Sequence, residues 1–330
     1  MTVKELAELA GVSPATISLV LNNKKGVSEK KRQEILALIE EKGYTVSRKE
    51  NRNKKNILFI RYSKTGHIVE ENAGFISKLL SAVEGQCRKA GYSLTILTSE
   101  DNLKEALGTA GRDAFYGIII LGTELEQEDY HALENLSLPY VVVDNVMPDF
   151  DCNSVAIDNR ENVFKAVKYF ADQGFTELGY FKGNENIQNL LERQQSVFEA
   201  AAKYHMAVPE ENVFTVPTTM LGAFEATEKY IKEKRKFPKC IFADNDIIAL
   251  GLIKALKQEA IAIPEEISII GFDNIPFGEI NSPSVSTMNV DAGILGSMTL
   301  SLLEHTAEDP SYRNVKVRAG GDFIKRQSTL

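Results

Sequence analysis

The sequence predicts an all-α helix-turn-helix head joined to a larger α/β core. Three short amphipathic helices fill the first 44 residues, with no strand pattern between them. From Asn56 onward, short apolar runs alternate with amphipathic helices, which is typical of parallel sheets covered by helices on both faces. About 275 residues follow the linker, enough for two lobes of ordinary domain size. We therefore expect a head at residues 1–44, a basic linker at 45–56 and a core at 57–330.

The first helix has both a start signal and a stop signal. Thr2 and Glu5 have the spacing of a capping box, in which each side chain bonds a free backbone N–H at the helix start. Leu6 and Leu9 then lie on one apolar face. Gly11 follows, where a left-handed residue commonly ends a helix.

The second and third helices are bounded as clearly. Ser13 is a good N-cap residue, and Pro14 suits the first helical position because its missing N–H would be unpaired there in any case. The side chains expected to face the interior are Ile17, Val20 and Leu21, and those expected to point outward are Ala15, Thr16, Ser18, Leu19 and Asn22. A third helix is expected from Ser28 to Gly43.

This arrangement is typical of a domain that places its second helix in the DNA major groove, although ordinary three-helix bundles share it. The outward face of the second helix is small and mostly polar, as an element that enters a groove must be. Residues 1–55 carry 12 basic and 7 acidic side chains, whereas the remaining residues carry 26 basic and 39 acidic ones. A basic module on an acidic body favours contact with nucleic acid through the head alone.

Two stretches of the head resemble a known family. The run from Ala10 to Asn22, AGVSPATISLVLN, closely resembles the recognition-helix signature of the LacI/GalR (lactose-repressor) family, and residues 27–35 and 41–44 resemble its third helix and exit. The resemblance implies a homodimeric transcription regulator, a repressor in most members. Such a protein binds double-stranded operator DNA through its head and a small-molecule effector through a core of the periplasmic-binding-protein type. The alternative is a small-molecule-binding protein of that fold whose head has degenerated and no longer binds DNA.

The resemblance also implies which head residues contact DNA. These are Ser13, Pro14, Ala15, Thr16, Ser18, Leu19, Asn22 and Ser28, to which we add Thr2 and the basic linker residues Arg48 and Lys49. Leu19 stands where many members carry Arg or His. A leucine can touch a thymine methyl group but cannot make the bidentate contact with guanine, so we expect a different base preference at that position.

The linker departs from the family. Members usually carry a Pro-Asn pair followed by Ala-Arg-x-Leu, which forms a hinge helix in the minor groove. Residues 45–56, TVSRKENRNKKN, contain no proline, no Ala-Arg pair and no leucine. Their basic side chains suit contact with the DNA backbone, and so few apolar residues favour a tether, or a helix formed only on DNA, over a preformed hinge. We therefore expect less DNA bending than the family normally imposes.

The alternation in the core places its elements in order. Strands are expected at residues 57–62, 92–98, 117–122, 140–144, 178–181, 213–216, 240–243 and 268–271. Helices are expected at residues 75–90, 162–173, 191–205, 223–234 and 246–258. Ligands of such sheets bind outside the carboxyl ends of the strands, so the residues that follow each strand are candidates for a binding site.

Polar side chains gather where these strands end. Asp144, Asn245 and Asp273 each follow an apolar run, and carboxylates and amides there suit a hydroxyl-rich ligand. The alternative is that they cap the following helices. That alternative is strong from Asp244 to Asp246, because a helix begins there at once.

Four stretches of the core resemble the same family, namely residues 158–166, Gly183 with Arg193, residues 243–251 and residues 264–274. The resemblance implies that Asp144, Arg193, Asn245 and Asp273 contact the effector, and we place Asn189 in the same cleft. Arg193 could instead form a surface ion pair with Glu192 or Glu199. The effector is expected to be a sugar or sugar derivative, with a nucleobase as the runner-up.

The loop after the first core strand is longer than in the family and carries His67, Glu70, Glu71 and Asn72. These side chains could recognise an amine or extra hydroxyl groups, or sense pH through the histidine. They could equally form a solvated loop. We assign His67 to the effector site.

The resemblance further implies three crossings between two lobes, near residues 158–160, 282–286 and 318–321. It predicts an N-lobe of 57–158 and 285–318 and a C-lobe of 159–284 and 319–330. In this interpretation the effector closes the lobes on each other and re-spaces the two heads of the dimer. The helix at 75–90 is expected at the dimer seam, with Leu79 and Val83 against the partner.

Composition excludes several other classes. No window approaches the ~20 apolar residues of a transmembrane span, and the chain begins on a capped helix rather than a signal peptide. Its three cysteines, Cys87, Cys152 and Cys240, are far apart, which indicates reduced thiols in the cytoplasm. The phosphate-loop, dinucleotide and serine-nucleophile motifs are missing and the four histidines are isolated. We therefore expect no enzyme, no metal and no cofactor.

Overall fold

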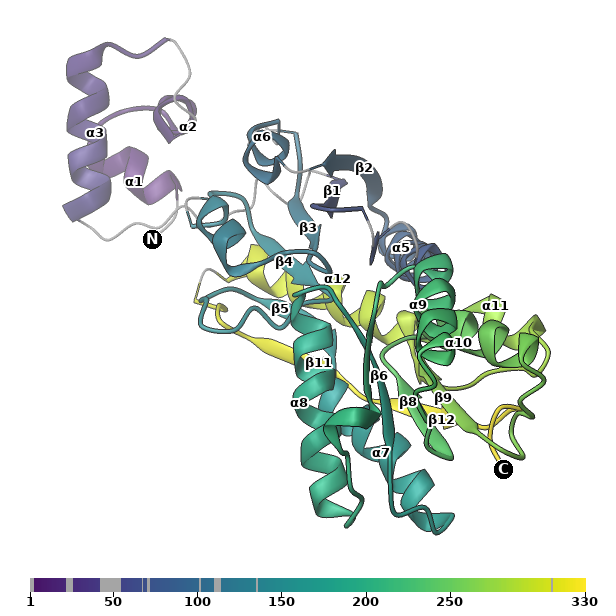
Figure 1. Ribbon diagram of the computed structural model, residues 1–330. Coiled ribbons are helices and arrows are strands. Elements are labelled where there is room, and N and C mark those ends of the chain that lie inside the picture. Colours follow the sequence, from purple (N-terminus) through teal and green to yellow (C-terminus); the bar gives the residue numbers. More distant parts are fainter. Residues whose placement is uncertain are drawn as a thin grey trace. The chain divides into compact units, whose positions relative to one another are not determined.

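Three helices form the head, α1 (Val3–Ala10), α2 (Pro14–Leu21) and α3 (Glu29–Glu41) (Figure 1). The computed structural model describes residues 3–21, 26–41, 55–66, 68–69, 72–100, 102–109, 114–134, 136–309 and 311–330. Residues Met1–Asn53 and Lys54–Leu330 are separate compact units, and each is described by itself. None of the described helices is long and apolar enough to cross a membrane.

The caps predicted for the head are present where the structure describes them. Gly11 has a φ of 63°, and the backbone N–H of Val12 bonds the carbonyl of Ala7 at 3.0 Å, so α1 ends in a Schellman motif. The Ser13 hydroxyl accepts the backbone N–H of Thr16 at 3.2 Å and caps α2. Leu6, Ile17 and Ile35, one from each helix, are fully buried together.

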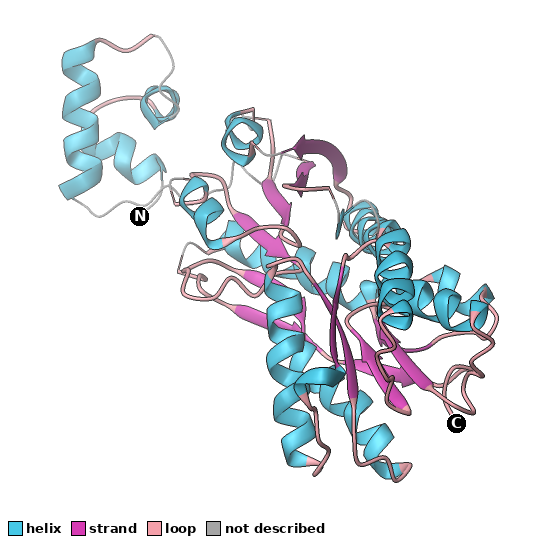
Figure 2. Ribbon diagram, in the orientation of Figure 1, coloured by secondary structure: helices cyan, strands magenta, loops and turns pink. Residues whose placement is uncertain are grey.

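The first lobe of the core is a parallel six-stranded sheet in the order β11-β5-β4-β3-β1-β2. Its strands are β1 (Asn56–Ser63), β2 (Ser93–Glu100), β3 (Gly117–Leu121), β4 (Tyr140–Val143), β5 (Ser154–Ile157) and β11 (Lys316–Ala319). Helices α5 (Ala73–Lys89) and α12 (Ala292–Glu308) cover one face, and α6 (Leu103–Gly108) and the 3₁₀ helix η2 (Gln127–Ala132) lie on the other (Figure 2). Side chains alternate along β1 accordingly: Phe59 packs with the α5 cluster and Leu58 with the α6 cluster.

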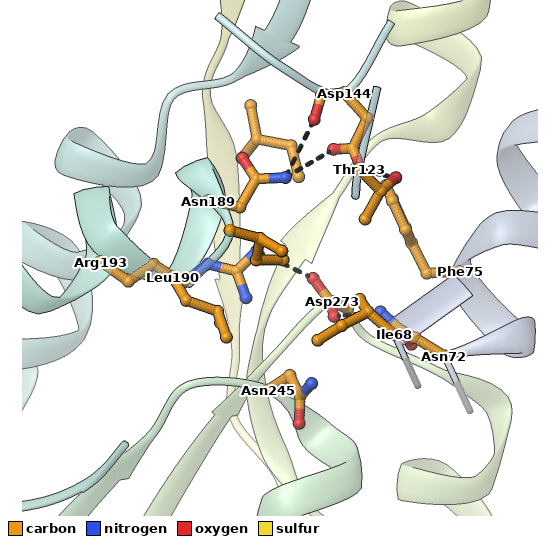
Figure 3. A pocket seen from close by; sticks show the side chains of 12 residues that line it. Ile68, Asn72, Phe75, Thr123, Asp144, Asn189, Leu190, Arg193, Asn245 and Asp273 are labelled. Carbon is orange, nitrogen blue, oxygen red and sulfur yellow. Dashed lines mark hydrogen bonds and ion pairs between the residues drawn. The ribbon is translucent and has the colours of Figure 1, made fainter. Parts of the chain in front are cut away.

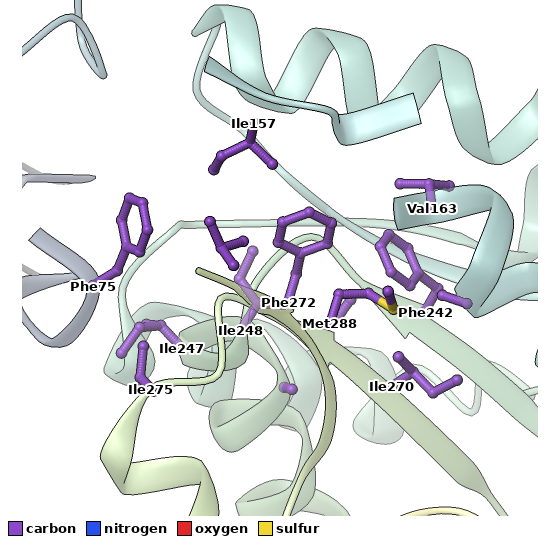
Figure 4. Packing of buried hydrophobic residues seen from close by; sticks show 14 of the residues in the cluster. Phe75, Ile157, Val163, Phe242, Ile247, Ile248, Ile270, Phe272, Ile275 and Met288 are labelled. Carbon is purple, nitrogen blue, oxygen red and sulfur yellow. The ribbon is translucent and has the colours of Figure 1, made fainter. Parts of the chain in front are cut away.

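The second lobe is a six-stranded sheet in the order β12-β10-β9-β8-β6-β7, parallel except for the edge strand β12, which runs antiparallel to β10. Its strands are β6 (Gly179–Gly183), β7 (Val213–Val216), β8 (Cys240–Ala243), β9 (Ser268–Phe272), β10 (Ser286–Val290) and β12 (Gly321–Ile324). Its helices are α7 (Asn159–Asp172), α8 (Gln188–Lys203), η3 (Glu210–Asn212), α9 (Met220–Lys232), α10 (Asp246–Gln258) and α11 (Pro276–Ile280). Helices α7 and α8 pack together, as do α9 and α10. Figure 4 shows part of the apolar cluster that fills this lobe and includes Phe75 and Ile157 of the first lobe, with Val163 of α7 beside Phe242 of β8.

The chain crosses between the lobes three times, after β5, after β10 and between β11 and β12. Two crossings lie where the sequence predicted them. The third lies at Asp291 rather than at residues 282–286, because β10 pairs with β9 in the second sheet. The N-lobe segment predicted at residues 285–318 therefore wrongly includes β10, which belongs to the second lobe. At the last crossing, a Cβ atom on Gly321 would lie 2.1 Å from the Asn289 carbonyl oxygen, so only glycine fits.

Another correction concerns α5. Leu79 and Val83, which we expected at a dimer seam, are fully buried inside the first lobe. A Cβ atom on Gly296 of α12 would lie 2.9 Å from the Val83 backbone nitrogen, so the two helices pack very closely there. A partner subunit cannot contact these two side chains.

Candidate functional site

A small cavity lies between the two lobes at the carboxyl ends of their strands (Figure 3). Its volume is about 20 Å³, close to the space that one water molecule needs. It is lined by Ile68, Asn72, Phe75, Thr123, Asp144, Ile157, Ile187, Asn189, Leu190, Arg193, Asn245 and Asp273. Five of the six predicted effector residues are among them, and the sixth, His67, lies outside the described residues.

Arg193 lies in α8 and is only 4% exposed. Its Nε donates to Asn159 at 2.9 Å, one terminal nitrogen donates to the Asp244 carbonyl, and the other lies 3.3 Å from the Asp273 carboxylate. Its guanidinium also covers the ring of Phe272 at 3.7 Å. Arg193 is thus part of the cleft.

The alternative of a surface ion pair for Arg193 is wrong. Glu192 pairs with Arg318 at 2.7 Å, and Glu199 pairs with Arg160 at 3.0 Å. Neither glutamate is therefore the partner of Arg193.

Asp144 follows β4 in the left-handed region, with a φ of 67°. Its carboxylate accepts the Thr123 hydroxyl at 2.6 Å and the Asn189 side-chain amide at 3.2 Å. The pKa of Asp144 is raised to about 7, mainly by burial and in part by the nearby Asp273 carboxylate, while the hydrogen bonds from Thr123 and Asn189 and the charge of Arg193 oppose the rise. Backbone strain at a buried polar residue is typical of a binding site.

Asp273 occupies the matching position after β9, with a φ of 97°. Its carboxylate accepts the side-chain amide of Asn72 at 2.7 Å and faces Arg193. Burial raises its pKa, and Arg193 and Asn72 oppose that rise. Each lobe therefore offers one aspartate to an asparagine of the other lobe, Asp273 to Asn72 and Asp144 to Asn189.

The residues around Asn245 have mainly structural contacts. The Asn245 side chain accepts the backbone N–H of Ile248 at 2.8 Å and caps α10, although the residue also lines the cavity. Asp244 accepts the Tyr180 hydroxyl at 2.6 Å, and Asp246 accepts the backbone N–H of Ile275 at 2.8 Å. Burial raises the pKa of Asp244 to about 6 and that of Asp246 to about 8. The predicted capping role thus applies to Asn245 together with its place in the cleft.

Several lining or supporting residues were missed by the sequence analysis. Thr123 comes just after the 117–122 run, so the rule that selected Asp144 would have found it. Phe75 has no such signal, because an apolar residue at the start of a helix looks like core. Asn159, which donates to Asn189 at 2.9 Å, lies three residues before the predicted helix and is the first residue of α7, so no sequence signal placed it at the cleft.

The head residues assigned to DNA are placed in part. Ser13 and Pro14 are exposed at the start of α2, and Ser28 is exposed at the start of α3. Thr16 and Leu19 are half-buried, so Leu19 is less outward-facing than predicted. Ala15 and Ser18 lie within α2, and Thr2, Asn22, Arg48 and Lys49 lie outside the described residues.

A helix-turn-helix head together with a two-lobed core that encloses a polar cleft defines a ligand-responsive DNA-binding regulator. Residues 2–47 match the bacterial regulatory proteins of the lacI family, and residues 167–329 match the periplasmic binding protein-like domain. The chain thus carries a lacI-family helix-turn-helix domain followed by a periplasmic binding protein-like domain.

Curated relatives cover nearly the whole chain. It is 28% identical over 334 residues to the HTH-type transcriptional repressor PurR of Photobacterium profundum, covering 99% of this chain and 98% of the relative. PurR of Pasteurella multocida is 28% identical over 338 residues, with 99% and 98% covered. These relatives are repressors and not enzymes, in agreement with the prediction that the chain is not an enzyme. Among the described residues, no cluster of His, Cys, Asp or Glu could hold a metal ion.

Solved structures support the predicted fold. The transcriptional regulator CelR in complex with cellobiose has a TM-score of 0.74 at 20% identity, with 99% of both chains covered. The lac repressor dimer bound to operator and the anti-inducer ONPF has a TM-score of 0.73 at 20% identity, covering 100% of this chain and 99% of that one. The head of three helices and the two α/β lobes are thus confirmed as a lac-repressor-like fold.

Proposed function

We propose that this chain is a homodimeric transcriptional repressor that acts in the cytoplasm and binds double-stranded operator DNA through its head. A small effector held between the lobes switches its affinity for the operator. The observation that carries this proposal is the convergence of Asp144 and Asn189, and of Asn72 and Asp273, from both lobes on one cavity. A ligand there touches both lobes and can bias their separation, which is what an allosteric switch requires.

The chemistry of the cavity favours a sugar or sugar derivative. Its polar lining combines carboxylates, carboxamides, a hydroxyl and one guanidinium, which can accept from and donate to several sugar hydroxyl groups. The single guanidinium, Arg193, already faces Asp273, so a phosphate group would meet two carboxylates with little compensating positive charge. Among the described lining residues, Phe75 is the only aromatic one, which suits one apolar face of a sugar better than a flat nucleobase.

The proposed switch exchanges internal contacts for ligand contacts. Ligand hydroxyl groups compete with the Asn72 amide for Asp273 and with the Asn189 amide for Asp144. The lobe separation that satisfies the ligand then differs from the one that satisfies these internal pairs, and the two heads of the dimer are re-spaced.

The head is proposed to contact DNA as the resemblance implies. The recognition face of α2 comprises Pro14, Ala15, Thr16, Ser18 and Leu19 in the major groove. Ser13 and Ser28 begin helices whose N-terminal N–H groups can bind phosphates, and Thr2, Asn22, Arg48 and Lys49 add contacts nearby.

A thermal-shift screen of the full chain tests the ligand class. The probes are glucose, galactose and glucosamine as sugars, glucose 6-phosphate as a sugar phosphate, and adenine and hypoxanthine as nucleobases. We expect a rise in melting temperature with at least one sugar and none with the phosphate or the nucleobases. A rise with a nucleobase alone would replace the sugar by the runner-up ligand.

Selection from a pool of randomised palindromic DNA at low salt tests whether the head binds operator DNA. We expect enrichment of a two-fold symmetric site whose binding weakens steeply with salt. Failure to retain any DNA at low salt would favour a small-molecule-binding protein with a degenerate head.

A further inference from the structure

The buried carboxylate of Glu124 is surrounded by backbone N–H groups of the loop that follows β1. Glu124 comes shortly after β3 and is 2% exposed. Its Oε2 accepts the backbone N–H groups of Lys64 at 2.8 Å, Thr65 at 2.7 Å and Gly66 at 3.2 Å, and its Oε1 accepts those of Ile68 at 3.1 Å and Val69 at 2.8 Å. Five N–H donors from one short segment therefore converge on one side chain.

This arrangement is an anion-binding nest occupied by a side chain of the protein itself. Gly66 supplies the left-handed residue of the nest, with a φ of 76°. Burial alone would raise the pKa of Glu124, but the backbone donors outweigh burial and the net pKa is lowered. The carboxylate is thus ionised at neutral pH, and it orders a loop whose N–H groups would otherwise lack acceptors.

Thr123 and Glu124 are neighbours after β3, and together they support the two first-lobe residues that reach across the cavity, Asp144 and Asn72. Thr123 donates its hydroxyl to Asp144 at 2.6 Å. Its neighbour Glu124 holds the backbone of Ile68 and Val69, and the Ile68 carbonyl accepts the backbone N–H of Asn72 at 2.9 Å. Asn72 in turn donates to Asp273 in the other lobe. The backbone at Thr123 and Glu124 is itself held, because the Asn145 amide donates to the carbonyls on either side of it, those of Gly122 at 2.9 Å and Leu125 at 3.1 Å.

We propose that Glu124 is a positioning residue of the effector site, which sets the shape of its first-lobe side through loop 64–69 and Asn72. The inference rests on the proposed function for its biological meaning, although its geometry does not depend on the identity of the effector. Glu124 itself does not line the cavity. An amide cannot replace it, because one of its two oxygens would become an NH₂ donor facing backbone N–H donors.

Hydrogen exchange on the full chain, without ligand or DNA, tests this role in Glu124→Gln. We expect backbone amides at 64–69 to exchange at least about tenfold faster, because each bond to a buried carboxylate is strong and its loss opens the loop. We also expect faster exchange at 271–275 in the second lobe, since Asn72 no longer holds Asp273. Faster exchange in the loop with no change at 271–275 would reduce Glu124 to a local structural role and overturn the proposal, as would an unchanged loop.

Two comparison variants separate the effect of Glu124 on loop 64–69 from the effect of Asn72 on the second lobe. Asn72→Ala is expected to raise exchange at 271–275 while leaving 64–69 protected, because the nest stays intact. Glu126→Gln removes a 2.9 Å ion pair with the Lys64 side chain but no backbone contact of the nest, so both segments should keep their protection.

Two milder variants decide the matter if Glu124→Gln fails to fold. Gly66→Ala strains the nest at its left-handed residue without altering the carboxylate, and it should loosen both segments, 64–69 and 271–275. Glu124→Asp keeps the charge and should retain part of the protection of both. Gly66→Ala with a loosened loop and a fully protected 271–275 segment would overturn the proposal. Because no ligand is used, failure of the sugar screen would leave this result unaffected.

Discussion

The side-chain amide of Asn72 donates a 2.7 Å hydrogen bond to the carboxylate of Asp273, joining two lobes through residues 201 positions apart. Asn189 donates to Asp144 in the opposite direction. Two amide–carboxylate pairs thus cross the cleft, and each pair can be removed singly.

Replacement of Asn72 by alanine is expected to lower the free energy of unfolding by about 1.5–3 kcal/mol, because a hydrogen bond to a buried carboxylate is lost. The lobes should also separate more easily, which small-angle scattering would detect as a larger radius of gyration. Asn102→Ala is a suitable control, because the Asn102 side chain caps α6 within the first lobe and should affect stability only. Equal radii for Asn72→Ala and the control would contradict the prediction.

Replacement of Arg193 by alanine is expected to destabilise the chain by about 3–5 kcal/mol, since Asp273 is left as a buried charge without its partner. Any effector response found in the thermal-shift screen should disappear, while the salt dependence of DNA binding by the head should not change. The exposed Arg160, paired with Glu199, provides the control, and Arg160→Ala should cost no more than about 1 kcal/mol. An unaltered effector response in Arg193→Ala would remove Arg193 from the site.

Asp144 predicts a pH dependence of stability. Its pKa in the folded protein is about 7 against a reference value of 3.8, so the folded state holds a proton that the unfolded state releases. The contribution of protonated Asp144 to the free energy of unfolding is therefore fully present below pH 3.8 and is lost as pH rises toward 7. Asp144→Asn, which tolerates the left-handed backbone, should flatten this part of the curve. Chemical denaturation at about pH 4.5, 6 and 7.5, which spans this window, would show it, and parallel curves for the two proteins would refute it.

The cap of α2 predicts a local effect in the head. Ser13→Ala removes the oxygen that accepts the Thr16 N–H, at a cost of about 1 kcal/mol, and should speed amide exchange throughout α2. Ser28 has the equivalent role for α3, where its hydroxyl accepts the Lys31 N–H at 3.4 Å. Ser28→Ala should therefore affect α3 rather than α2. Exchange in α2 that is the same in both variants would show that Ser13 does not act as the cap.

The sequence was most informative where an element carries its own boundaries. The strands β7 and β8 and the helix α10 begin and end at the predicted residues, because the two strands are mostly apolar runs between polar or proline residues and α10 begins after the N-cap residue Asn245. The strands β10, β11 and β12 had no such signal. Each mixes polar and apolar residues, and β11 and β12 join different sheets across a single glycine, which only tertiary pairing decides.

The same distinction applies to the site. Asp144, Asn245 and Asp273 were found because each follows a strand whose position the sequence predicts. The contact of Asn72 with Asp273, and the support of its loop by Glu124, depend on segments far apart in the chain. No local pattern announces such a contact, so the sequence could name the loop but not the residue within it that reaches the cleft.

The small volume of the cavity has a bearing on how fast an effector can bind. A space of about 20 Å³ cannot admit a sugar ring, so the sugar effector that we propose would enter only after the lobes have parted. The observed association rate should therefore rise with sugar concentration and then reach a plateau equal to the opening rate. Asn72→Ala should raise that plateau, so the two amide–carboxylate pairs limit how fast the regulator can respond to its effector as well as how stably the lobes stay closed.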